Sequence, residues 1–222
     1  MSNHTIGCMV ACGMAILPLG SLHALELADY RMVDLSHSYD ENTVYWPTSP
    51  TQFEKQTLAN GKTSDSDDGY FYSSYAICTP EHGGTHIDAP VHFAEGGLSV
   101  DRIAPNRLIG PAVVIDVSAQ AARDRNYRVS ADDILAFEKQ HGEIAAGTIV
   151  LVRTDWSRRW PNARDYLGDD TPGDVSQLQF PGYGAEATRL LTEVRGVAMI
   201  GIDTASIDYG KSKDFIAHRI GA

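Results

Sequence analysis

The stretch GTIVLVRTDW, from Gly147 to Trp156, decides how this chain is expected to fold. Its apolar residues are largely β-branched and follow one another without a polar interruption, which is typical of a buried strand. Two other runs have the same character, LIGPAVVIDVS at residues 108–118 and GVAMIGIDTAS at residues 196–206. Together they predict three buried strands in the second half of the chain.

Helical patterns fill the gaps between these runs. Ser130 is a suitable N-cap for a helix that ends at Gly142, and a second helix is predicted from about Gly184 to Val194. Strands that alternate with helices in this way are typical of a layered α/β domain. The fold class predicted from the residues is therefore α/β.

The N-terminal third is expected to be richer in strands and loops. RMVDLSH, residues 31–37, predicts a short strand, and ANGKTSDSDDGY, residues 59–70, predicts a polar segment of turns. YFYSSYAICT, residues 70–79, alternates aromatic or apolar residues with small polar ones and predicts a strand. That strand leads directly into a segment rich in histidine.

Length and charge limit the possible partners. At 222 residues the chain is long enough for one sizeable domain with a buried core. Its formal net charge of -11 argues against nucleic acid or an anionic membrane surface as the main partner, because both would be repelled. A small molecule is the expected partner. Basic residues are scattered, apart from the segment RTDWSRRW at residues 153–160.

The N-terminus carries an apolar run from Ile6 to Leu19, which has the length of a secretory signal and is too short to span a bilayer. We therefore expect a signal peptide at residues 1–24 and a periplasmic or secreted protein. The alternative is a cytoplasmic protein whose domain begins near Tyr30. No later segment is apolar enough to predict a membrane span.

The segment HGGTHIDAPVH, residues 82–92, holds three of the eight histidines. His82, His86 and Asp88 offer two imidazoles and a carboxylate to a divalent metal. Glycine and proline disfavour a helix here, and in an extended chain His86 and Asp88 point the same way, while the glycine pair could fold His82 back beside them. The alternative interpretation is a polar loop whose histidines bond to backbone carbonyls.

Three protein ligands would leave positions open for water and substrate, as a catalytic metal requires. Such a metal brings the pKa of bound water toward ~7 and polarises a carbonyl. His92, four residues past Asp88, need not be a ligand and is expected to act as the general base that later returns a proton to the leaving group.

HGGTHIDAPVHF resembles the H-x-G-T-H-x-D-x-P-x-H signature of the metal-dependent cyclase family, which includes bacterial kynurenine formamidases and isatin hydrolases. VDLSH, YWP, TIVLVRTDW, GIDTASID and SKDFIAHR agree in order, so the resemblance extends from about Tyr30 onward. It implies a swivelling β/β/α fold in a single domain at residues 30–222, a homo-oligomer (dimer or tetramer), and hydrolysis of a C–N amide bond with zinc or manganese.

The same resemblance assigns roles to individual residues. It implies that His82, His86 and Asp88 bind the metal, that His92 donates and accepts the proton, and that Trp46 contacts the substrate. His218 matches a ligand for a second metal. Two-metal formamidases carry a further glutamate ligand beyond that histidine, whereas the sequence ends at Ala222, so we expect the domain to be incomplete at its C-terminus.

The sequence thus predicts a metal-dependent amidohydrolase that acts on an aryl formamide, of the N-formylkynurenine type, or on a small cyclic amide, of the isatin type. Two alternatives stay open: a metal- or ligand-binding protein without turnover, and a lactonase or dehydratase that uses the same site. Several other residues are expected to have structural roles, with Asp208 supporting a turn or a neighbouring side chain, Cys78 buried, and His37 and His141 at the surface.

Overall fold

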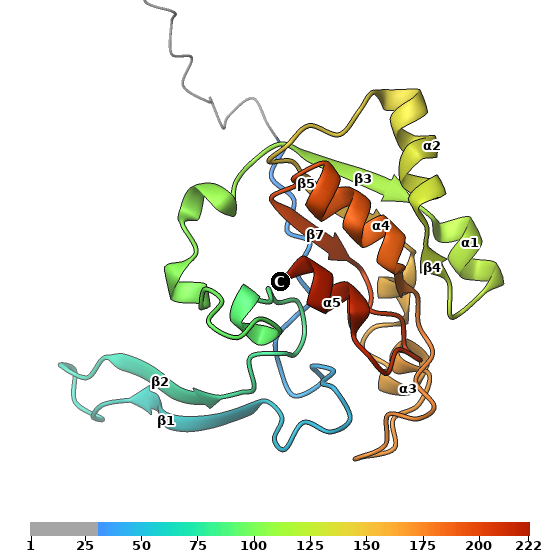
Figure 1. The fold of residues 1–222 in the computed structure, drawn as a ribbon. Coiled ribbons are helices and arrows are strands. Elements are labelled where there is room, and N and C mark those ends of the chain that lie inside the picture. Colours follow the sequence, from blue (N-terminus) through green and yellow to red (C-terminus); the bar gives the residue numbers. More distant parts are fainter. Residues whose placement is uncertain (1–30) are drawn as a thin grey trace, which may run out of the picture. The chain divides into compact units, whose positions relative to one another are not determined.

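The computed structural model describes residues 31–222 (Figure 1). Contacts divide the chain at Leu35/Ser36 into two units, and the fold described below is that of Ser36–Ala222. The signal peptide predicted at residues 1–24 lies outside the described residues. The strand predicted at residues 31–37 is wrong: this segment pairs with no other strand of the described chain, and Met32 and Leu35 are exposed.

A three-stranded parallel sheet lies at the centre of this unit. Its strands are β3 (Ala112–Asp116), β5 (Ile149–Arg153) and β7 (Met199–Ile202), in the order β3-β5-β7. Each strand falls within one of the three apolar runs, so the predicted strands are confirmed. Parallel neighbours need crossover connections, and the segments between these strands supply the helices.

Five α-helices accompany the sheet within the described residues. The predicted helix after Ser130 is confirmed as α2, and the helix predicted at residues 184–194 is confirmed as α4 continued by a π-helical turn, Leu190–Val194. Two short strands, β4 and β6, pair in parallel and form a second, small sheet. The bounds are α1 Ser118–Arg123, α2 Ala131–His141, α3 Ala163–Leu167, α4 Ala185–Arg189, α5 Ile216–Gly221, β4 Arg128–Val129 and β6 Gly182–Tyr183.

The start of α2 shows why the local sequence predicted it well. The Ser130 side chain accepts a hydrogen bond from the Asp133 backbone N–H, and the Asp133 carboxylate accepts one from the Ser130 N–H. This reciprocal capping box satisfies two amides that have no partner within the helix. The helix ends at Gly142, whose φ of 92° is costly for other residues.

The main core lies between the sheet and one layer of helices. Val150 and Val152 of β5 are fully buried against Ile134 of α2, Leu191 of the π-helical turn and Ala217 of α5. Figure 1 shows α4 and α5 lying across the sheet on this side. Val114 of β3, which points to the other face, is 54% exposed. The helix layer therefore fixes α5, and with it His218, against the sheet.

An antiparallel hairpin precedes the sheet and leads to the histidine segment. It consists of β1 (Glu54–Lys62) and β2 (Phe71–Cys78), so the strand predicted at residues 70–79 is confirmed. The prediction of turns throughout residues 59–70 is wrong at its start, because residues 59–62 complete β1 by pairing with β2. Phe71, Ile77 and Cys78 are exposed, so the predicted burial of Cys78 is also wrong: no layer formed by residues 31–222 covers this hairpin.

No helix of the described residues combines the length and the apolar character needed to cross a membrane.

The packing of α2 yields a prediction about stability. Ile134→Ala is expected to lower the free energy of unfolding by about 2–5 kcal/mol, because it leaves a cavity in the main core. The neighbouring Leu135 is 45% exposed on the same helix, and Leu135→Ala is expected to cost about 1 kcal/mol or less. Urea denaturation followed by circular dichroism measures both values, and equal losses would contradict the packing described here.

Candidate metal centre

The loop after β2 folds back through two glycines. Gly83 forms an isolated antiparallel bridge with Tyr45, and a Cβ atom at Gly83 would overlap the Tyr45 ring. Gly84 has a φ of +59°, a left-handed conformation that glycine adopts without strain. The reversal expected from the glycine pair is therefore present. It brings His82 alongside the residues that follow.

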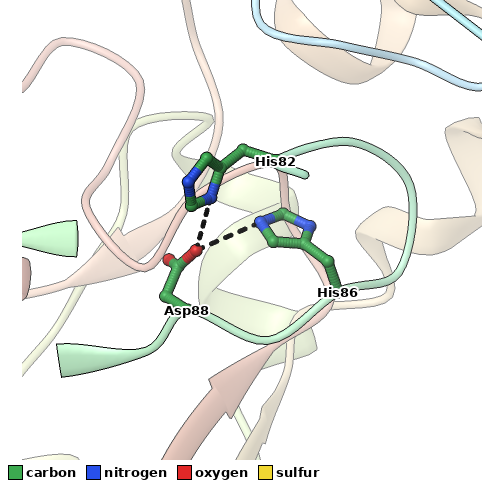
Figure 2. Close-up of side chains that lie close together, drawn as sticks. All are labelled: His82, His86 and Asp88. Atoms are coloured by element: carbon green, nitrogen blue, oxygen red, sulfur yellow. Dashed lines mark hydrogen bonds and ion pairs between the residues drawn. The ribbon is translucent and has the colours of Figure 1, made fainter. Parts of the chain in front are cut away.

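His82, His86 and Asp88 converge on one point (Figure 2). Asp88 Oδ1 lies 2.7 Å from His82 Nδ1 and 3.3 Å from His86 Nε2. Ligand atoms from the three side chains lie within 4.8 Å of one another, and each side chain is about one third exposed or less. Solvent and a small molecule can thus reach the group that the sequence singled out.

A second group of possible ligands shares Asp88 and includes His218, which is far from the histidine loop in the sequence. Asp88 Oδ2 lies 3.3 Å from Nε2 of His218, which is carried by α5. His92 completes this group; its ring stacks on that of His82 with centroids 3.8 Å apart. All five residues that the sequence assigned to metal binding and proton transfer therefore lie together. Asp88 is common to both groups.

Asp208 sets the orientation of His218. Its carboxylate, 1% exposed, lies 2.7 Å from His218 Nδ1 and accepts hydrogen bonds from the backbone N–H groups of Ala217 and His218. An ionised carboxylate only accepts, so the Nδ1 atom carries the hydrogen and Nε2 is directed at Asp88. The expectation that Asp208 supports a neighbouring side chain agrees with this contact.

The histidines of the cluster favour the ionised form of the Asp88 carboxyl group. Burial tends to raise the pKa of Asp88, but hydrogen bonds from His218 and His86 outweigh it and hold that pKa well below its usual range. Burial tends to lower the pKa of His86 and of His218, and their bonds to carboxylates raise both above the ordinary value. The pKa of His92 is lowered, chiefly by burial. The His92 imidazole is therefore neutral near pH 7.

This donor set fits a first-row divalent cation. A carboxylate surrounded by imidazoles supplies the hard oxygen and borderline nitrogen donors that zinc and manganese accept in proteins. A cation would also compete with protons for His86 and His218, since both histidines face the same carboxylate and that carboxylate raises the pKa of each. The residues present are therefore compatible with one metal ion, and the sharing of Asp88 offers a place for a second.

Aromatic rings lie beside the histidines, and the sequence identified only one of them. Phe93 lies 4.5 Å, centroid to centroid, from His218 and 5.5 Å from Phe215. The Trp46 ring lies 6.3 Å, centroid to centroid, from that of Phe215, so Trp46 joins the cluster through that ring. Sequence reasoning missed Phe93 and Phe215. Phe93 follows His92 directly, whereas Phe215 comes close only through the fold.

The other histidines considered lie outside this cluster. His37 stacks on Trp160 with centroids 4.6 Å apart, and His141 lies beside Phe137 at the end of α2. Neither belongs to a group of possible metal ligands among the described residues. Their expected structural roles agree with these positions.

This chain is similar to known proteins in family, sequence and structure. The family model described as "Putative cyclase" matches residues 33–209. Isatin hydrolase of Roseibium aggregatum is 36% identical over 183 residues, which cover 77% of this chain and 67% of that protein. Kynurenine formamidase of Salinibacter ruber is 26% identical over 187 residues, which cover 84% of this chain and 75% of that protein.

Among solved structures, isatin hydrolase A from Labrenzia aggregata bound to benzyl benzoate superimposes with a TM-score of 0.73. The two chains are 31% identical, and the match covers 86% of this chain and 75% of that one. The predicted fold class, an α/β domain of the swivelling β/β/α type, is confirmed by this likeness.

The contact between Gly83 and Tyr45 can be tested through metal affinity. Gly83→Ala is expected to weaken the binding of zinc or manganese about tenfold or more, because the added methyl group displaces the loop that carries His82 and His86. Calorimetric titration measures the affinity. Gly61→Ala is the control, since a Cβ there meets nothing within 4 Å. Equal affinities for Gly83→Ala and the unaltered protein would contradict this role of the loop.

Proposed function

This chain belongs to the cyclase family, and from that premise we propose that it is a metal-dependent hydrolase that cleaves the C–N bond of a small aromatic amide. The observation that carries the proposal is the convergence of His82, His86, His92 and His218 on the Asp88 carboxylate. Relatives named isatin hydrolase and kynurenine formamidase support the same class of reaction.

Zinc or manganese would be held by His82, His86 and Asp88. His218 is positioned to join Asp88 in holding a second ion, with Asp208 fixing its ring. When bound, such an ion supplies Lewis-acid chemistry: it makes water a nucleophile at neutral pH and polarises an amide carbonyl. The protein's part is to hold the donors at one point and to keep the site open to water.

His92 is the proposed proton carrier. Its imidazole stacks on His82 beside the proposed ligands, and its lowered pKa leaves the ring neutral, in the form that accepts a proton. A neutral ring nitrogen takes a proton from the attacking water and returns it to the departing amide nitrogen. The two transfers leave His92 unchanged at the end of each turnover. His92 is thus a base first and an acid second.

The rings beside His218 favour an aromatic substrate. Phe93, Phe215 and Trp46 present apolar surface next to the polar cluster, the usual arrangement of a small-molecule site. Addition of water to the C–N bond of a cyclic amide of the isatin type opens the ring and yields one molecule that carries an aromatic amine and an α-keto carboxylate, whose ketone carbon is attached to the ring. The higher identity to an isatin hydrolase favours this substrate over an aryl formamide.

Export and self-assembly complete the proposal. The apolar run from Ile6 to Leu19 supports processing near residue 24 and a periplasmic or secreted location. Exposed apolar side chains on the hairpin and the sheet, among them Phe71 and Val114, support a homo-oligomer. N-terminal sequencing of the mature protein and light scattering test these two points.

The roles of His92 and Asp88 can be separated by two substitutions. His92→Ala is expected to keep its bound metal and to lose turnover by about 100-fold to 10,000-fold, the usual contribution of general acid–base catalysis. Asp88→Ala is expected to lose both metal and turnover, because both groups of donors share its carboxylate. Metal analysis by mass spectrometry, together with hydrolysis of isatin and N-formylkynurenine, measures the two effects.

His141→Ala is the matched control, since it removes an imidazole that lies outside the cluster, and it should behave as the unaltered protein. Unchanged turnover in His92→Ala would refute the proton-transfer role. Bound metal without hydrolysis of either amide in the unaltered protein would instead support a binding protein, or a lactonase or dehydratase on the same site.

A further inference from the structure

The arginine-rich segment at residues 153–160 takes no part in the proposed reaction, yet it lines a cavity of about 490 Å³. Arg158 and Arg159 come from the 3₁₀ turn after β5, Trp156–Arg159, and Arg125 comes from the loop after α1. Trp160, Pro161 and Asp165 also line this cavity. It shares no residue with the histidine cluster.

Positive charge in the cavity is only partly compensated. The guanidinium carbon of Arg159 lies 3.9 Å from the centroid of the Trp156 ring, and that of Arg125 lies 4.9 Å from the same centroid. Arg158 pairs with Asp155 at 3.3 Å. Within residues 31–222 no carboxylate is at salt-bridge distance from Arg125 or Arg159, although Asp165 attracts Arg125 from further away. Burial and the charge of Arg159 both lower the pKa of Arg125.

Hydrogen bonds hold the Arg125 guanidinium group, and the backbone of the turn that carries the other two arginines, in place before any ligand arrives. Arg125 Nη2 donates to the backbone carbonyls of Asp165 and Gln179, at 3.1 and 3.5 Å. The carboxylate of Asp203, just after β7, accepts from the backbone N–H groups of Thr154 and Trp156. The turn that carries Arg158 and Arg159 is thereby tied to the end of a central strand. A preorganised site loses less entropy when it binds.

We propose that this cavity binds a small oxyanion, specifically an aromatic carboxylate. Guanidinium groups present paired N–H donors that match the two oxygens of a carboxylate, and the same groups can donate to the oxygens of phosphate. Trp160 and Pro161 add an apolar wall, which favours a carboxylate attached to a ring. On a chain of net charge -11, convergent arginines make this cavity a local positive field.

Titration with benzoate, and separately with inorganic phosphate, tests the proposal on the full-length, metal-loaded protein in a low-chloride buffer. Calorimetry and tryptophan fluorescence both report binding. Benzoate is expected to saturate at millimolar concentration or below and to bind more tightly than phosphate. Arg159→Gln is expected to weaken it about tenfold or more, since hydrogen bonds to charged groups are strong. Arg158→Gln is likewise expected to weaken benzoate binding. Because the Arg158 side chain is 74% exposed, this variant should fold and keeps the test decisive even if Arg159→Gln does not.

Arg164→Gln is the matched control, because Arg164 is 71% exposed and pairs with Asp170 outside the cavity. It should bind benzoate as the unaltered protein does. Absence of saturable benzoate binding would overturn the site. So would Arg158 and Arg159 variants that bind benzoate with the affinity of the unaltered protein. Tighter binding of phosphate would overturn the aromatic assignment. Benzoate binding that Asp88→Ala abolishes and the arginine variants retain would place the anion at the metal centre and likewise overturn the proposal.

Discussion

The carboxylate of Asp88 is the point at which the loop after the hairpin meets α5. One oxygen faces His82 and His86 from the loop after the hairpin, and the other faces His218 from α5. Withdrawing a carboxylate from water, even in part, costs free energy unless it is paired, and here three imidazoles pair it. Packing elsewhere in the fold holds both partners of this contact. Ala217 fixes α5 in the main core, and Gly83 fixes the loop against Tyr45.

Local patterns in the sequence predicted those elements whose conformation depends on residues adjacent in the sequence. The three parallel strands, the capped helix after Ser130 and the loop reversal at Gly83–Gly84 all follow from backbone preferences and apolar runs. The strand predicted at residues 31–37 failed, and residues 59–62 form a strand where a turn was expected. In both places pairing partners decide the conformation, and the segment itself does not encode its partner.

The same division applies to the site. His82, His86, Asp88 and His92 lie within eleven residues, so their grouping could be read from the sequence, whereas His218 was placed only by resemblance. Phe215 and the orienting contact of Asp208 depend on how α5 returns to the sheet. The burial of Cys78 was mispredicted because the two-stranded hairpin, unlike the central sheet, has no layer packed on it within the described part of the chain.

Two clusters of opposite character therefore lie in one acidic chain. At the histidine cluster, a carboxylate and imidazole nitrogens can offer lone pairs to a cation; burial works to raise the pKa of Asp88, and the hydrogen bonds from His218 and His86 keep it low. At the arginine cavity, guanidinium groups offer only donors, and their mutual repulsion is relieved by an anion. Both are positioned by carboxylates of the segment that follows β7: Asp203, directly after the strand, anchors the turn before Arg158, and Asp208, further along, orients His218. Segments that follow the carboxyl ends of parallel strands commonly position functional groups in this way.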